Sequence, residues 1–275
     1  MRYVKIDVKT KDNNSLPFLG SMLRGAFGSA LKDVVCINPT KECGGCFAAG
    51  GCLYFDFFEA KNRFHNFRLD FELNPKNLDF SLVLFNEAIE KHPYILSALH
   101  RMLTQKGLGR ERRKSEIDKI IINGQSVFED GEFKSVAGIE GTDFSIESFS
   151  SAVKIELKTP LRIKREGRFV RPENLELKDI LLSLVKKQAF FDGVEAKLES
   201  FGTIVSKNLS FADFTRYSNR QKRKMKIGGI VGEIVAKDLD PTAYRLLKYG
   251  EITGVGKLNT FGLGKIEVED LICEK

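Results

Sequence analysis

The chain has 275 residues, enough for one large domain or two of ordinary size. Hydrophobic residues make up 42% of it and aromatic residues 10%, which supports a packed core and excludes an intrinsically disordered chain. The formal net charge is +7, and the lysines and arginines gather at residues 110–114, 162–171 and 216–226. Clustered positive charge favours an anionic partner over an evenly solvated surface.

The first residues predict a strand and not a targeting segment. Val4, Ile6 and Val8 alternate with charged residues, as in a half-buried strand. This stretch lacks the apolar centre of a signal peptide, and no segment has the apolar length of a transmembrane helix. We therefore expect a cytoplasmic protein that does not associate with a membrane.

The apolar pattern that follows predicts a helix, two strands, a second helix and a closing strand. Pro17 opens the first helix, and apolar residues recur at spacings of three and four through Leu31. The next elements are strands over 67–73 and 80–84, a helix over 87–105 and a strand over 116–122. The order βαββαβ is typical of a ferredoxin-like unit.

The second half repeats this order of elements without a repeat of residues. Its expected elements are a strand over 153–157, a helix over 175–190, strands over 201–217 and 225–235, a helix over 241–249 and a strand over 264–271. We predict an α+β protein of two tandem ferredoxin-like domains, residues 1–140 and 150–275. The polar segment 123–147 is a linker or an added hairpin.

Four of the five cysteines crowd into an insertion after the first helix. Cys36, Cys43, Cys46 and Cys52 lie among glycines at 44, 45, 50 and 51. Four thiolates with one Cys-x-x-Cys step suit a closed tetrahedral site, and a disulfide pair is less expected in the cytoplasm. A structural zinc ion is favoured, an iron–sulfur cluster is the alternative, and free thiols are the third interpretation.

Basic and glycine-rich motifs dominate the last quarter. Residues 216–226 carry the densest positive charge, and Gly228, Gly229 and Gly232 follow. A glycine-rich loop spans 254–264 and holds Lys257. Bare backbone beside lysine and arginine suits a phosphate backbone, so this region points to a nucleic acid.

Several motifs together resemble the RAMP superfamily of CRISPR systems. They are the stretches 23–28, 159–164, 216–221 and 228–232, and the loop Gly256-Lys257 to Gly264. Within that superfamily the chain is similar to the endoribonuclease that cuts precursor CRISPR RNA. The resemblance implies cleavage without a metal, in which the ribose 2′-hydroxyl attacks its own 3′-phosphate and leaves a 2′,3′-cyclic phosphate and a 5′-hydroxyl.

This chemistry needs a general base and cations that stabilise the phosphorane. Many relatives have a histidine where this loop begins, but this chain reads Gly254-Val255-Gly256-Lys257. Our catalytic candidates are therefore His65, in a polar connection beside Arg63, and Lys257. No cofactor is expected for catalysis.

The candidate RNA-binding residues are cationic, aromatic or glycine. They are Arg24, Arg162, Lys164, Arg216, Tyr217, Arg220, Lys222, Arg223, Lys224, Gly256, Gly262 and Gly264. Tyr217 and Phe169 are candidates for base stacking, and packing is the alternative role for both. The glycines are expected to let backbone amides and the neighbouring strand come close.

Two other functions stay open. A catalytically weak or inactive subunit would hold repeat RNA, alone or with other CRISPR effector subunits, as a monomer or a homodimer. A zinc-containing DNA-binding regulator ranks last, because no helix-turn-helix pattern is present.

Overall fold

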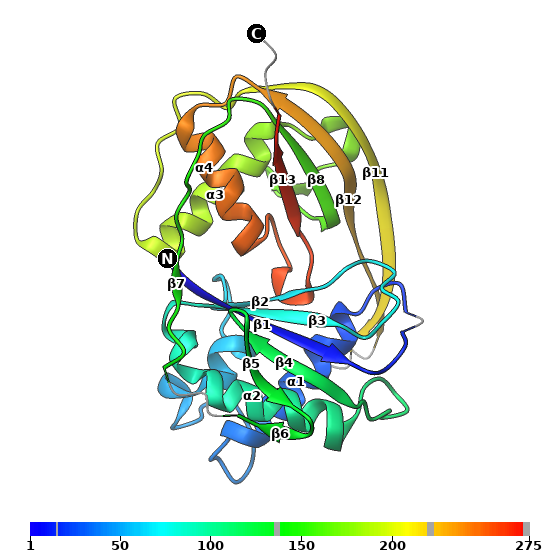
Figure 1. Cartoon of the computed structure of the whole chain (residues 1–275). Helices are drawn as coiled ribbons and strands as arrows, with labels where there is room; N and C mark the ends of the chain where they lie inside the picture. Colours follow the sequence, from blue (N-terminus) through cyan, green and yellow to red (C-terminus); the bar gives the residue numbers. More distant parts are fainter. Residues whose placement is uncertain (15, 135–137, 219–222, 272–275) are drawn as a thin grey trace. The chain divides into compact units, whose positions relative to one another are not determined.

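The computed structural model describes residues 1–14, 16–134, 138–218 and 223–271. The chain forms two compact units, Met1–Asp143 and Phe144–Lys275 (Figure 1). The candidate RNA contacts Arg220 and Lys222 lie outside the described residues, and only the backbone is described for Arg216 and Tyr217. Among the described helices, none combines the length and the apolar character that a membrane span requires.

The first unit is built on an antiparallel sheet. Its strands are β1 (Arg2–Thr10), β2 (Phe67–Asp70), β3 (Phe80–Phe85), β4 (Ile117–Ile122), β5 (Gln125–Glu129), β6 (Glu132–Phe133) and β7 (Thr142–Asp143). The central order β2-β3-β1-β4 is that of a ferredoxin-like unit, as predicted. The segment after β4 forms the β5–β6 hairpin, which extends the sheet beside β4.

Two helical regions cover this sheet. Helix α1 (Gly20–Val35) begins three residues after Pro17, and its buried residues include Leu23, Phe27 and Leu31. The second region was predicted as a single helix. It consists of three consecutive segments, namely a 3₁₀ segment (Asn86–Lys91), α2 (His92–His100) and a π-helical turn (Arg101–Lys106). The α-helical part starts where Pro93 occupies the first turn, a position that tolerates proline.

The second unit has the same topology. Its strands are β8 (Val153–Leu161), β9 (Lys164–Arg165), β10 (Arg168–Phe169), β11 (Thr203–Ser218), β12 (Arg223–Lys237) and β13 (Ile266–Asp270). The four-stranded sheet has the order β11-β12-β8-β13, and β9 and β10 form a separate short hairpin. The prediction of tandem ferredoxin-like folds is thus confirmed.

The strands β11 and β12 are much longer than their neighbours and form a curved ribbon at one edge of the sheet (Figure 1). They pair from Thr203↔Lys237 to Ser218↔Arg223, whereas β12 pairs with β8 only between Ile230 and Ala236. The basic part of the ribbon therefore extends past the end of β8 as a two-stranded arm.

Helices α3 (Leu177–Asp192) and α4 (Pro241–Thr253) complete the second core. A capping box between Glu176 and Asp179 starts α3, and Gly193 in the left-handed region ends it. At the start of α4 the Asp240 carboxylate accepts a hydrogen bond from the amide of Ala243. These signals explain why the predicted ends of both helices lie within a few residues of the observed ones.

Candidate nucleic-acid interface

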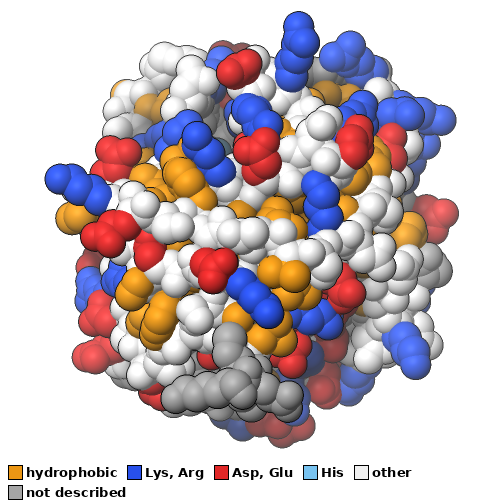
Figure 2. Space-filling model, turned by 90° about the horizontal axis from the view of Figure 1, so that it is seen from above, with side chains coloured by type: hydrophobic (Ala, Val, Ile, Leu, Met, Phe, Trp, Pro, Cys, Tyr) orange, Lys and Arg blue, Asp and Glu red, His pale blue; other side chains and the backbone are white. Residues whose placement is uncertain are grey.

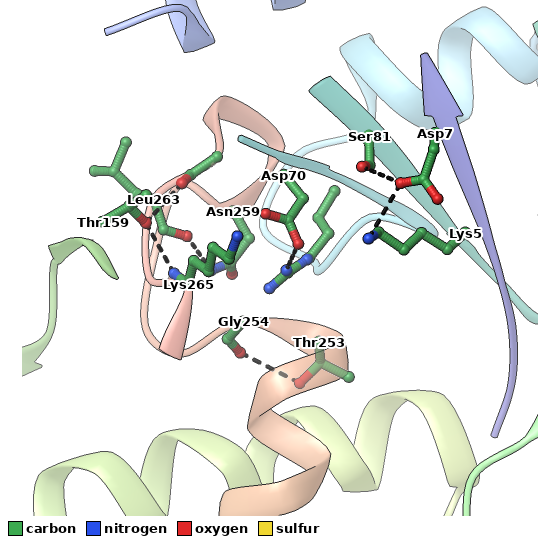
Figure 3. Close-up of polar contacts among 12 residues, drawn as sticks. Lys5, Asp7, Asp70, Ser81, Thr159, Thr253, Gly254, Asn259, Leu263 and Lys265 are labelled. Atoms are coloured by element: carbon green, nitrogen blue, oxygen red, sulfur yellow. Dashed lines mark hydrogen bonds and ion pairs between the residues drawn. The ribbon is translucent and has the colours of Figure 1, made fainter. Parts of the chain in front are cut away.

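The glycine-rich loop 254–264 is anchored at the end of β8. The amide of Lys257 donates to the carbonyl of Arg162 at 2.9 Å, and the amide of Gly264 donates to that of Pro160 at 3.2 Å. The Thr159 hydroxyl donates to the Gly262 carbonyl at 2.8 Å and accepts from the amide of Lys265 at 2.9 Å. Figure 3 shows Thr159 and Lys265 beside Asn259 and Leu263 of the loop. The loop is a fixed part of the unit.

The glycines make this packing possible. A Cβ on Gly256 would lie 2.6 Å from the Arg162 carbonyl oxygen, and one on Gly264 would lie 1.9 Å from that of Val255. Their amides, and that of Gly262, already donate within the protein, to Ser183, Pro160 and Asn259. The expected close approach of the strand is present, and the three amides are engaged inside the fold.

The buried side chain of Lys187 forms hydrogen bonds with the loop. The Lys187 ammonium donates to the carbonyl oxygens of Thr253 (2.9 Å) and Gly254 (2.6 Å) and to the Asn259 side-chain oxygen (2.6 Å). Asn259 in turn donates to the carbonyls of Val255 and Leu263. This network fixes the loop conformation and leaves Lys257 and Leu258 exposed at its tip.

Arg162 links three parts of the second unit that are far apart in sequence. Its carbonyl accepts from Lys257 in the glycine-rich loop, and its guanidinium donates to the Gly228 carbonyl of β12 at 3.0 Å. The guanidinium also lies 4.0 Å from the ring centroid of Phe169 in β10. Burial lowers the pKa of Arg162, and the nearby Asp213 opposes that shift. The half-buried guanidinium is therefore held in one place, on the residue whose carbonyl anchors Lys257.

The β9–β10 hairpin adds cations and an aromatic ring. Lys164 and Phe169 face each other across the hairpin, with the ammonium 4.9 Å from the ring centroid. Arg165 instead binds Asp179 and Glu176 at the start of α3, and the hydrogen bond to Asp179 raises the pKa of Arg165. Of the cluster 162–171, Arg162 and Lys164 thus join the candidate surface, while Arg165 stabilises the helix.

The basic arm adds further positive charge. Arg223 and Lys224 are exposed, and Lys226 pairs with Asp213 at 3.1 Å while remaining mostly in solvent. Gly228 and Gly229 allow close strand approach, because a Cβ on Gly229 would lie 2.4 Å from the Leu161 carbonyl oxygen. On the face shown in Figure 2, lysine and arginine side chains are interspersed with acidic and hydrophobic ones.

The first unit holds a second group of candidate residues, around Arg24 and His65. Arg24, on α1, lies with its guanidinium 4.8 Å from the Phe58 ring centroid. Phe58 belongs to a π-helical turn (Phe55–Glu59), and the Nδ1 atom of His65 donates to the carbonyl of Asp56 in that turn at 3.1 Å. Because a carbonyl can only accept, the neutral His65 carries its proton on Nδ1 and leaves Nε2 as a proton acceptor.

The surroundings of His65 keep it uncharged. Burial, and then the positive charges of Arg24 and Arg63, lower the pKa of His65 to about 4. Arg63 also pairs with the Asp56 carboxylate. The imidazole is thus neutral at physiological pH, and it stands where two arginines provide positive charge.

The sequence analysis missed Tyr54. Its ring stacks on Phe58 with centroids 5.3 Å apart, and its hydroxyl donates to Glu59 at 3.4 Å. Burial, followed by the charge of Glu59, raises the pKa of Tyr54 to about 12. The tyrosine is therefore a neutral hydrogen-bond donor in the Arg24 group. No periodic pattern marks it, because it lies in an irregular segment between the cysteines and β2.

The cysteine segment carries the donor types of a zinc site. Cys36, Cys43, Cys46 and Cys52 are half-buried and form no disulfide. Across the described residues, no three or more cysteine, histidine or acidic side chains are grouped as metal ligands. Thiolates suit zinc, but their placement here does not form the tetrahedral site, so that site stays a prediction from the spacing.

Comparison with known proteins gives two family matches. Residues 1–138 match the model AF_1859_N, described as an N-terminal domain, and residues 155–266 match the model described as CRISPR-associated endoribonuclease Cas6. An uncharacterized protein of Archaeoglobus fulgidus is 25% identical over an alignment of 273 positions that covers 90% of this chain and 90% of the other.

Solved structures share the fold over nearly the whole chain. A Cas6 product complex has a TM-score of 0.61 and 15% identity, covering 97% of this chain and 99% of the other. Thermus thermophilus Cas6 has a TM-score of 0.58 and 14% identity, with 97% of each chain covered. A Cas6-related protein from Pyrococcus furiosus has a TM-score of 0.52 and 12% identity, covering 100% and 99%. The resemblance inferred from the motifs is confirmed.

Proposed function

The chain belongs to the family that the AF_1859_N domain defines and carries a Cas6 domain in its second half, and from this premise we propose that it binds CRISPR repeat RNA and cleaves it. One observation carries the proposal: Arg162 joins the glycine-rich loop, β12 and the β9–β10 hairpin into one cationic and aromatic surface. The solved relatives that share this fold include Cas6 product and substrate-mimic complexes.

The proposed reaction is transesterification without a metal. In the second unit, Lys257 and Arg162 place positive charge that can stabilise a phosphorane. In the first unit, the Nε2 atom of His65 is the candidate acceptor for the proton of a 2′-hydroxyl. Burial is the main cause of the low pKa of His65, and a phosphate bound near Arg24 and Arg63 would offset the smaller contribution of their charges.

The second candidate function is an RNA-binding subunit with weak or no activity. Two observations favour it. The loop that holds a histidine in many relatives begins here with Gly254, whose carbonyl accepts from Lys187. His65 also has a pKa of about 4 in the free protein, which makes it a weak base. Both functions require the surface around Arg162, and they differ only in the cleavage step.

The deciding experiment is incubation of the protein with its repeat RNA in EDTA. A parallel series of RNAs carries a single 2′-deoxy substitution at each candidate position. Cleavage at one position, blocked by the 2′-deoxy there, supports the endoribonuclease. Tight binding of every RNA without cleavage supports the binding subunit, and loss of both from folded protein would reject the proposed function.

A further inference from the structure

We propose that two neighbouring cation–aromatic pairs on the second unit, Arg162 with Phe169 and Arg171 with Phe211, are stacking platforms for unpaired nucleotides. The inference rests on the proposed function and defines its substrate further: the bound RNA has an unpaired stretch of at least two nucleotides. Phe211 and Arg171 belong to none of the motifs that carry the family resemblance.

Both phenylalanines are exposed where a core role would bury them. Phe169 and Phe211 are each 42% exposed, although phenylalanine is among the residues most often buried. The Arg162 guanidinium lies 4.0 Å from the Phe169 centroid, and the Arg171 guanidinium lies 4.9 Å from the Phe211 centroid. Four of the described cation–aromatic contacts lie within residues 162–211, and these two each pair an arginine with an exposed phenylalanine ring.

The platforms are held on a rigid backbone. Phe211 pairs with Ile230 across β11 and β12, and Ile230 pairs with Leu161 of β8. Phe211, Ile230 and Leu161 therefore lie opposite one another on adjacent strands, and Arg162 directly follows Leu161 in the chain. Arg171 follows β10 in an extended conformation, and the amide of Val170 between the two platform residues donates to the carbonyl of Ile163 at 3.0 Å.

The spacing of Phe169 and Arg171 suits consecutive nucleotides whose bases do not stack on each other. Phe169 and Arg171 are two residues apart on extended backbone, which places them on the same side at about 6.6 Å. This backbone separation is roughly twice the 3.4 Å rise between stacked bases in one strand of a duplex. Two successive bases would each meet a separate platform. Paired bases have no free face for this contact, so the site selects single-stranded RNA.

Leucine variants test the aromatic face while preserving most of the apolar volume. Phe169→Leu, Phe211→Leu and the double variant are compared with Val205→Leu, which alters another exposed apolar residue of β11. Affinity is measured for single-stranded repeat RNA and for a fully paired duplex of the same sequence. A 2-aminopurine base placed along the single strand reports stacking by its fluorescence.

We expect each Phe→Leu change to weaken single-strand binding by about tenfold, since base–aromatic stacking contributes about 1–3 kcal/mol per base. Duplex binding and the Val205→Leu protein should change by less than twofold. The quenched 2-aminopurine position should regain fluorescence in the Phe211→Leu protein. Equal loss on both RNAs, or a Phe211→Leu protein that binds like wild type, would overturn the platforms while the proposed function stands. A wild-type protein that binds no RNA would overturn both.

Discussion

The buried Lys187 ammonium donates a hydrogen bond to the side-chain oxygen of Asn259 at 2.6 Å, and through it α3 holds the glycine-rich loop. The same ammonium donates to two carbonyls at the end of α4. The partners of this buried lysine include three neutral oxygens. Lys187 therefore acts as a structural support for the loop that presents Lys257.

Replacing Lys187 with methionine should destabilise the protein. Methionine fills a similar volume but removes the ammonium that donates to the Thr253 carbonyl and to the Asn259 side-chain oxygen, and each unsatisfied group costs about 1–3 kcal/mol. We expect the free energy of unfolding in urea to fall by about 2–4 kcal/mol. The control is Lys186→Met, one position along α3, where the side chain is exposed. Equal stability of the two variants would contradict the supporting role.

The stability of the protein should depend on pH through His65. Its pKa is about 4 in the folded chain against 6.5 in the unfolded chain, so between these values the unfolded state binds a proton that the native state does not. Stability is therefore lost as the pH falls from 6.5 towards 4, and this contribution is constant above that window. Thermal unfolding at several pH values should show a shallower slope for His65→Gln than for wild type. Parallel slopes would show that His65 titrates normally.

A methyl group on Gly264 should disrupt the loop. The added Cβ would meet the Val255 carbonyl oxygen at 1.9 Å, and the backbone φ of +72° already disfavours any other residue. Gly193 offers a matched control, because its φ is +71° but an added Cβ there would meet no described atom within 4 Å beyond its own helix and chain neighbours. We expect Gly264→Ala to cost about 2–4 kcal/mol more than Gly193→Ala in chemical denaturation. A similar loss of stability in both variants would mean that the positive φ, and not the contact with the Val255 carbonyl, determines the cost at Gly264.

The four cysteines between α1 and β2 predict about one zinc ion per chain. Protein purified without chelator should contain it by mass spectrometry of the metal, and Cys43→Ser should reduce the content. Removal of the ion should lower the melting temperature without blocking an RNA cleavage that needs no metal. Four thiols that react freely with a thiol reagent in the native protein would show that no ion is bound.

Local patterns in the sequence predicted most of the fold. Alternation at Val4, Ile6 and Val8 and the three-and-four spacing through Leu31 placed β1 and α1, because each element buries one face. The predicted helix over 87–105 was only partly right. Its apolar period holds throughout, but period does not distinguish α-helical turns from the 3₁₀ and π turns at its two ends.

The candidate site was harder to predict, since it depends on contacts between distant segments. Arg162 and Lys257 were chosen separately for charge, and nothing in the sequence shows that the carbonyl of one accepts from the amide of the other. Charge also grouped Arg165 with Arg162, although Arg165 binds Asp179. Lys187 and Phe211 escaped notice because a single lysine in a helix and a single phenylalanine in a strand look ordinary.

The central claim is that RNA binds the surface around Arg162, and its most direct test is affinity for an uncleavable 2′-deoxy repeat RNA across a salt series. We predict that Arg162→Gln and Lys257→Ala each weaken binding by about tenfold, and that Lys257→Ala reduces the slope of log affinity against log salt by about one. Lys237→Ala, at the other end of β12, should leave both quantities unchanged. If all three variants bind this RNA like wild type, the surface around Arg162 is not the RNA-binding site.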